Sequence, residues 1–262
     1  MLKFGFFNFH IVWMSPWPLY SSCGLFMILA STLLMKDSIM NFFFFIMVIL
    51  FFFSSFYGWM RDICYESFLQ GEHTFLVQKG LKTGMVLFIL SEVFFFFSFF
   101  WSLFYFSFSP SIEIYSWPPE GIISLDPMEI PMLGTLILLS SGVTVTWSHY
   151  CILENKKKES MISLILTIIF GIFFSFLQLK EYISCSFTMS DSVFGSIFFM
   201  STGFHGIHVL IGTMILFSCY TRMVNNHFSK NHHVGFEMGI WYWHFVDVVW
   251  LFLYICLYWW SY

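Results

Sequence analysis

The amino-acid sequence predicts an all-α, polytopic membrane protein with seven transmembrane helices. Of its 262 residues, 58% are hydrophobic and only 10% are charged, whereas a soluble domain carries about 25% charged residues. The mean hydropathy is +0.79, and a water-soluble fold could not bury so much apolar side chain. This composition excludes an ordinary soluble enzyme, a basic nucleic-acid-binding protein and a disordered chain.

Seven apolar stretches justify the seven helices, because about 20 residues are needed to cross roughly 30 Å of hydrocarbon. They cover residues 16–35, 39–59, 77–108, 127–152, 160–182, 191–224 and 233–260. Several exceed the minimum length, so we expect them to tilt or to protrude from the membrane. The polar segment 61–82 is predicted to be a substantial loop. The connection 109–126 contains two adjacent prolines that restrict its backbone.

The positive charges are distributed unevenly between the two predicted sides. Lys36 and Lys180 lie on one side, and the other side holds Lys3, Arg61, Lys79, Lys82, Lys156, Lys157, Lys158, Arg222 and Lys230. Cytoplasmic or matrix loops carry the excess of Lys and Arg. The N-terminus is therefore expected on the matrix or cytoplasmic side, and the C-terminus on the opposite side. We interpret the lysines at 156–158 as a topological anchor, and the first 15 residues predict no cleavable presequence.

Glu92 is the clearest ionisable residue at membrane depth. It lies about 22 Å along the third helix from Val77, at about 1.5 Å per residue. No Lys or Arg lies nearby on its own helix, so we expect the carboxyl group to be protonated. Two hypotheses stay open, a structural hydrogen bond and a role in proton movement.

Histidines and a second carboxylate mark the last two helices. His205 and His208 are three residues apart and share a helix face. They are expected to form interhelical hydrogen bonds rather than to bind haem or a metal. Glu237, His244 and Asp247 form one stripe on the seventh helix, which favours attachment to neighbouring helices over ion movement. The six cysteines include no CxxC pair, so neither a disulfide framework nor a copper or zinc site is predicted.

Cationic and aromatic residues at helix ends predict contacts with lipid headgroups. Trp59 and Arg61 end the second predicted span, and Arg222 ends the sixth. An arginine can form charge-assisted hydrogen bonds with a phosphate. The alternative is that these side chains only extend along the helix toward water.

Several motifs resemble the cytochrome c oxidase subunit III family of the mitochondrial type. In chain order they are SPWP at 15–18, Trp59 with Arg61 and Asp62, QKGL at 78–81, LFILSEV at 87–93, WPP at 117–119, SGV at 141–143, TGFHGIH at 202–208, NHH at 231–233 and WYWHFVDVVW at 241–250. The resemblance extends from His10 almost to the C-terminus.

The resemblance implies a subunit without a redox centre, packed against the haem- and copper-bearing subunit I of a proton-pumping oxidase. It implies an N-terminal segment with two helices (1–70), a five-helix bundle (71–262) and a V-shaped, phospholipid-filled cleft. By position, Glu92 matches the family's buried carboxyl group, and Trp59, Phe88 and Arg222 match its lipid pocket. The implied contributions are assembly, stability, lipid binding and proton uptake.

Three departures from the family pattern stand out. Tyr65 replaces a usual second arginine, Glu72 replaces a histidine, and Tyr105 replaces another histidine. The loss of a cation at Tyr65 predicts weaker binding of anionic lipid.

The sequence therefore predicts a multi-pass subunit of the oxidase in the mitochondrial inner membrane, without a cofactor or nucleic-acid partner of its own. Haem a and copper are expected in partner subunits, and phospholipids are expected to bind this chain. Two alternatives from other classes are a stand-alone proton-coupled transporter using Glu92 and Asp247, and a b-type haem protein using His149, His205, His208 or His244.

Overall fold

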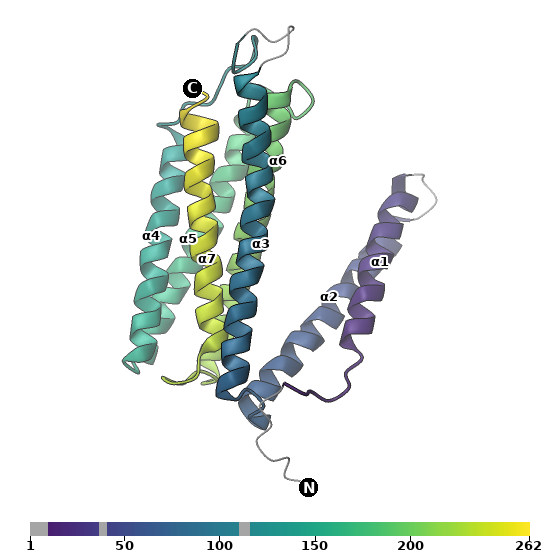
Figure 1. Cartoon of the computed structure of the whole chain (residues 1–262), viewed down its shortest axis with the longest axis vertical. Coiled ribbons are helices and arrows are strands. Elements are labelled where there is room, and N and C mark those ends of the chain that lie inside the picture. The colour runs from purple at the N-terminus through teal and green to yellow at the C-terminus, as the bar shows by residue number, and fades with distance from the viewer. Residues whose placement is uncertain (1–9, 37–40, 110–115) are drawn as a thin grey trace. The chain divides into compact units, whose positions relative to one another are not determined.

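The computed structural model describes residues 10–36, 41–109 and 116–262, and regular structure in these ranges is helical. The helices are α1 (Trp17–Lys36), α2 (Phe42–Tyr65), α3 (Phe75–Phe108), α4 (Ile130–Leu153), α5 (Lys157–Ser184), α6 (Val193–Val224) and α7 (Val234–Leu253) (Figure 1). Two π-helices extend α2 and α7, η1 (Glu66–Gln70) and η2 (Tyr254–Trp259). Within the described residues, seven helices are long and apolar enough to span a membrane. The predicted all-α class and the seven spans are confirmed.

The predicted substantial loop at 61–82 is wrong. Helix α2 and its π-helical extension continue to Gln70, and α3 begins at Phe75. Gly71 follows the helix with a φ of +67°, in the left-handed region that favours glycine. Apolar residues mark the depth of the hydrocarbon, whereas a helix continues wherever its backbone hydrogen bonds are satisfied. The polar residues of this segment therefore lie mostly on helix ends.

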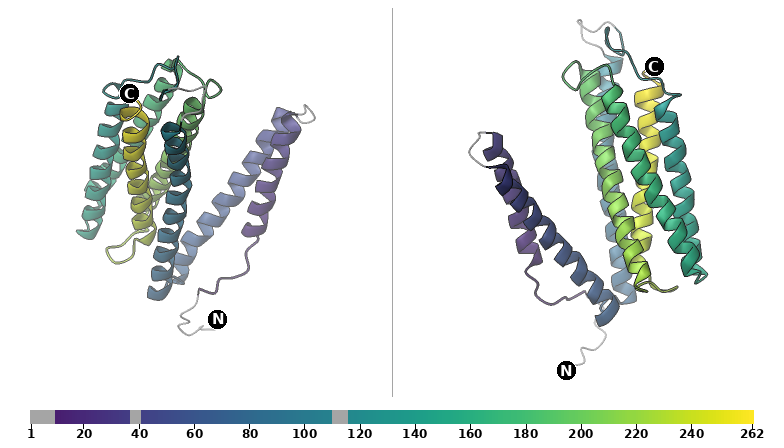
Figure 2. Two further views of the ribbon diagram at one scale, coloured as in Figure 1. Left: turned by 45° about the horizontal axis from the view of Figure 1, so that its top comes forward. Right: turned by 180° about the vertical axis from the view of Figure 1, so that it is seen from behind.

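The chain divides into two compact units, Met1–Leu81 and Lys82–Tyr262, with the boundary inside α3. In the first unit α1 packs against α2 (Figure 2). Trp17 lies over Gly58, where an added Cβ atom would be 2.6 Å from the indole ring. The Trp17 indole N–H also donates to the Asp62 carboxylate, at 2.5 Å. Close approach at a glycine and one hydrogen bond therefore join these two helices.

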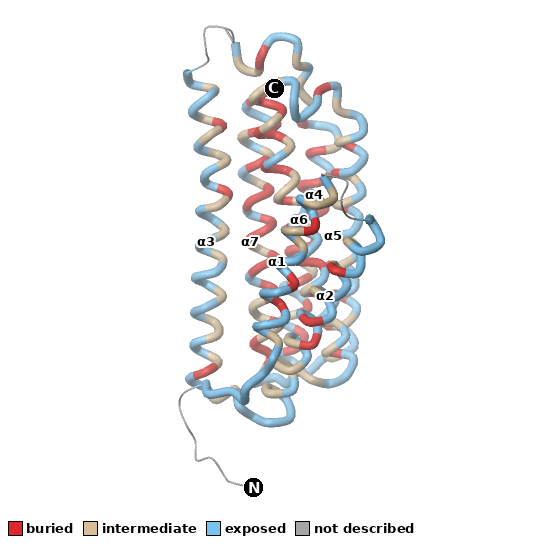
Figure 3. The backbone as a smooth tube through the Cα atoms, turned by 90° about the vertical axis from the view of Figure 1, so that its right-hand side faces the viewer, coloured by how far each residue is buried: buried red, intermediate tan, exposed pale blue. Residues whose placement is uncertain are grey.

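In the second unit α7 is the most deeply buried helix, and α4 and α6 pack against it (Figure 3). The Trp243 side chain on α7 is fully buried. Cβ atoms added to Gly171 on α5 and Gly212 on α6 would lie 2.7 and 2.9 Å from its ring. These glycines therefore leave the space that the indole fills, as small residues do at close helix contacts in membranes.

Helix α3 is mostly exposed in the structure, unlike α7 (Figure 3). Phe96 and Leu103 are its deeply buried large side chains in the second unit. Near its C-terminal end, Phe104 contacts Trp260 with ring centroids 5.4 Å apart. A few buried side chains therefore hold α3 to the other helices, and its remaining apolar surface suits contact with lipid or protein.

Gly171→Ala is expected to destabilise the folded subunit by about 1–3 kcal/mol, because the new methyl group overlaps Trp243 and Thr213. Gly206→Ala is the matched control, since a Cβ atom there meets no heavy atom within 4 Å. The measurement is the midpoint of thermal dissociation of the purified membrane complex. Equal midpoints for both variants would contradict the packing assigned to Gly171.

Candidate functional site

Glu92 on α3 and His208 on α6 form a polar pair inside the second unit. Glu92 Oε2 lies 3.0 Å from His208 Nε2. The other ring nitrogen, His208 Nδ1, lies 2.7 Å from the Phe204 carbonyl oxygen. Because a carbonyl only accepts, Nδ1 carries the proton of that bond. Nε2 can then accept from a protonated Glu92 or, in an imidazolium, donate to the carboxylate.

Aromatic rings surround this pair. The His208 ring centroid lies 5.1 Å from that of Phe96 and 6.3 Å from that of Tyr242. The side chains of Glu92 and His208 are 24% and 11% exposed. Hydrogen bonds are electrostatically stronger in such an apolar setting than in water. The geometry therefore combines attachment of α3 to α6 with a carboxyl–imidazole pair able to hold a proton.

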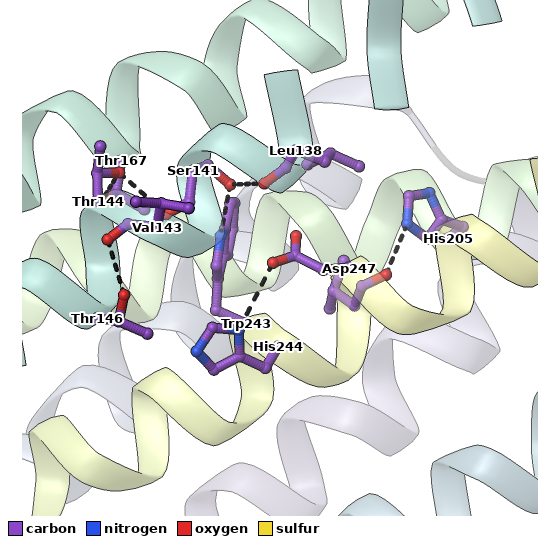
Figure 4. Close-up of polar contacts among 11 residues, drawn as sticks. Leu138, Ser141, Val143, Thr144, Thr146, Thr167, His205, Trp243, His244 and Asp247 are labelled. Atoms are coloured by element: carbon purple, nitrogen blue, oxygen red, sulfur yellow. Dashed lines mark hydrogen bonds and ion pairs between the residues drawn. The ribbon is translucent and has the colours of Figure 1, made fainter. Parts of the chain in front are cut away.

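His205 lies one turn before His208 and has a different partner. Its side chain is fully buried, with Nε2 3.3 Å from the carbonyl oxygen of Val246 on α7 (Figure 4). The ring lies against Trp250, with centroids 5.1 Å apart. The two histidines therefore connect α6 with two different helices, His208 with α3 and His205 with α7.

His244 and Asp247 lie on α7 where it faces α4. His244 Nδ1 and Asp247 Oδ2 are 3.8 Å apart (Figure 4). Gly142 on α4 leaves room for the carboxylate, because an added Cβ atom would lie 3.0 Å from Asp247 Oδ2. Close by, the indole N–H of Trp243 donates to Ser141 Oγ on α4 at 2.9 Å. Polar side chains thus line the α4–α7 contact.

The four predicted lipid-binding residues fall into two pairs. Trp59 and Arg61 belong to Met1–Leu81, and Phe88 and Arg222 belong to Lys82–Tyr262. Arg61 is half exposed, and its guanidinium group lies 3.0 Å from the Asp62 carboxylate. The Phe88 ring stacks on Tyr242 with centroids 6.3 Å apart. The guanidinium carbon of Arg222 lies 4.5 Å from the centroid of Phe228.

The sequence model of the cytochrome c oxidase subunit III family matches residues 7–262. The chain belongs to this family. It is 53% identical over 254 residues to cytochrome c oxidase subunit 3 of Drosophila melanogaster, with 97% of each chain covered. It is 51% identical over 255 residues to that of Lycodon semicarinatus and 50% identical over 254 residues to that of Osphranter robustus, with the same coverage.

This membership makes the chain a subunit of cytochrome c oxidase, a terminal oxidase, in which it is not the catalytic subunit. The transporter and b-type haem alternatives are not supported. The family resemblance identified from the motifs is confirmed.

For three charged groups the structure shows burial or partners that the sequence did not predict. Glu181 on α5 is only 2% exposed, although its neighbour Lys180 indicated an interfacial position. Lys82 pairs with Glu237 from the first turn of α7. Lys157, which the sequence predicted as part of an anchor, donates to the Val224 carbonyl oxygen at 2.9 Å. It therefore also binds the C-terminal end of α6, where carbonyl groups lack partners.

An ion pair between Lys156 and Glu154 lies outside the membrane spans. Lys156 Nζ lies 2.6 Å from Glu154 Oε2, between α4 and α5. The hydrogen bond from Lys156 lowers the pKa of the Glu154 carboxyl group below its ordinary value. Both side chains are substantially exposed, so the pair is expected to contribute little to stability.

Ser141→Ala is expected to destabilise the subunit by about 1–3 kcal/mol, because the buried Trp243 N–H loses its acceptor. Ser140→Ala should change stability much less, since the Ser140 hydroxyl bonds only the Ile137 carbonyl of its own helix in the structure. Thermal dissociation of the purified complex measures both variants. A Ser141→Ala complex as stable as the Ser140→Ala complex would contradict the importance of this bond.

Proposed function

We propose that this chain is the non-redox core subunit of a mitochondrial cytochrome c oxidase in the inner membrane, next to the haem- and copper-bearing subunit I. That complex transfers electrons from cytochrome c to oxygen and pumps protons, with haem a and copper in partner subunits. This chain contributes assembly, stability, bound phospholipid and support of proton uptake. Family membership and the seven candidate spans support this proposal.

The proposed orientation has the N-terminus in the matrix and the C-terminus in the intermembrane space. Its support is the uneven distribution of Lys and Arg between the two ends of the spans. Lys156, Lys157 and Arg222 lie at adjoining ends of α4, α5 and α6, on the side assigned to the matrix. Lys3 contributes to the same sequence pattern but lies outside the described residues.

The observation that carries the proton-linked proposal is the 3.0 Å contact between Glu92 and His208. An ionisable group within a transmembrane helix is costly, so a carboxyl group placed there beside an imidazole supports a functional role. A carboxyl–imidazole pair can hold one proton on either partner and keep its hydrogen bond. Such a pair supports proton uptake by the oxidase as a local proton acceptor, and also attaches α3 to α6.

Glu92→Gln is expected to leave assembly intact, because the amide keeps a hydrogen bond to His208. Glu92→Leu leaves His208 Nε2 without this partner and is expected to weaken assembly by about 1–3 kcal/mol. The yield of subunit per haem a after mild-detergent purification measures assembly. If Glu92→Gln failed to assemble while Glu92→Asp assembled, hydrogen bonding by a neutral group would not explain the contribution of Glu92 to assembly.

The proton-linked role is tested in the assembled Glu92→Gln complex, by the rate of proton uptake during turnover. We expect slower uptake than in the unaltered complex, because the amide cannot release a proton. Asp247→Asn is the control, since it removes a membrane carboxyl group that pairs with His244 instead. Uptake that is unchanged in Glu92→Gln would leave only the structural role.

Lipid binding is proposed at Arg61 because its exposed guanidinium group lies at the polar end of α2, the same helix end that carries half-buried Trp59. Arg61→Gln is expected to reduce co-purifying anionic phospholipid about fivefold at this position, the equivalent of about 1 kcal/mol per basic group. Arg61→Lys keeps the charge and serves as the control. Quantitative lipid mass spectrometry of the purified complex provides the measurement. Equal lipid retention in both variants would show that Arg61 only pairs with Asp62.

A further inference from the structure

Two histidines and a glutamate meet where α4 ends and α7 begins. His149 belongs to α4, His233 immediately precedes α7, and Glu237 lies in the first turn of α7. His149 Nε2 lies 3.3 Å from His233 Nε2. His233 Nε2 also lies 3.3 Å from Glu237 Oε1. The three potential ligand atoms all lie within 4.8 Å of one another.

The two separations from His233 match the spacing of ligands around a tetrahedral zinc ion. Zinc–nitrogen bonds of about 2.0–2.1 Å at the tetrahedral angle place neighbouring ligand atoms about 3.3–3.4 Å apart. Both 3.3 Å contacts of His233 have this length. Two imidazoles and one carboxylate are also a known zinc ligand set, with a fourth position left for water or another group.

Neighbouring groups orient two of the three ligands. His233 Nδ1 lies 3.1 Å from the Ser229 carbonyl oxygen, so it donates and leaves the Nε2 lone pair directed at the cluster. Lys82 pairs with Glu237 Oε2, while Oε1 is the oxygen nearest to His233. Metal-binding histidines and carboxylates characteristically have such second hydrogen-bond partners.

The arrangement leaves an acceptor pair on His233 and Glu237 directed at the same point. The His233 Nε2 lone pair and the Glu237 carboxylate oxygen are both acceptors, and they face each other at 3.3 Å. A hydrogen bond from His149 Nε2 or a bound metal ion can satisfy the His233 lone pair, and a metal ion can bind both acceptors at once. His233 is 5% exposed, and the Lys82 side chain beside Glu237 is 37% exposed, so the cluster lies just below the protein surface.

We propose that His149, His233 and Glu237 form a binding site for a divalent cation of intermediate softness, with Zn²⁺ as the best match. The bound ion joins the C-terminal part of α4 to the N-terminal end of α7. The site is separate from the Glu92–His208 pair and does not depend on the proposed lipid or proton roles.

The test uses the intact purified oxidase, treated with a chelator and then equilibrated with Zn²⁺ alone. Elemental analysis gives zinc per haem a. We expect the unaltered complex to bind one more equivalent of zinc than the His233→Gln or His149→Gln complex. In these two variants we expect the apparent zinc affinity at this site to be more than 100-fold lower. Loss of a second-sphere partner costs roughly 10- to 100-fold, and a direct ligand contributes more. His232→Gln is the matched control, because this adjacent histidine lies outside the cluster, and it should retain the ion.

Electron cryomicroscopy of the unaltered complex with and without Zn²⁺ keeps the test decisive if a variant does not assemble. New density between the three side chains, together with the extra equivalent, supports the site. Equal zinc content in the unaltered complex and the His233→Gln complex overturns the proposal. Density elsewhere, with none between these residues, also overturns it and leaves hydrogen bonds among the three side chains as their only link.

Discussion

The packing of Trp243 in the centre of the second unit is the contact on which the arrangement of its helices depends. The indole lies against Gly171 of α5 and Gly212 of α6 and donates its N–H to Ser141 of α4. One side chain of α7 therefore contacts three other helices. In a membrane, where lipid is as apolar as the side chains, such close packing and hydrogen bonding hold helices together. A methyl group at Gly171 or Gly212 would push α7 away from α5 or α6, which the other contacts hold beside it.

Interhelical polar contacts add specificity to this packing. His208 connects α6 to α3, His205 connects α6 to α7, and Trp243 connects α7 to α4. Each satisfies a group that would be costly to leave without a partner in an apolar interior. The Glu92–His208 contact differs from the other two because both partners can exchange a proton. The same bond therefore positions α3 and is the basis of the proposed role in proton uptake.

At the ends of the spans, charged side chains continue the interhelical connections. Lys82 of α3 pairs with Glu237 of α7, and Lys157 of α5 binds the end of α6. Lys82 and Lys157 therefore have specific structural partners in addition to the role in orientation that we propose for the basic residues. The proposed cation site lies beside one of these pairs and places His149 of α4 against His233. Its ligands come from helices that the Trp243 packing already holds together.

The sequence by itself determined the fold class, the seven spans and the family, because hydrophobic length and local motifs are properties of consecutive residues. It also singled out Glu92, since a charged residue in a long apolar stretch is visible without a structure. It did not locate the helix ends around 61–82, because hydropathy reports the depth of the membrane and not the extent of backbone hydrogen bonding.

Only the tertiary structure paired Glu92 with His208, 116 residues away, and His149 with His233, 84 residues away. The rotation and depth of packed helices decide which side chains meet, and these depend on contacts such as Gly171 with Trp243 that no local pattern encodes.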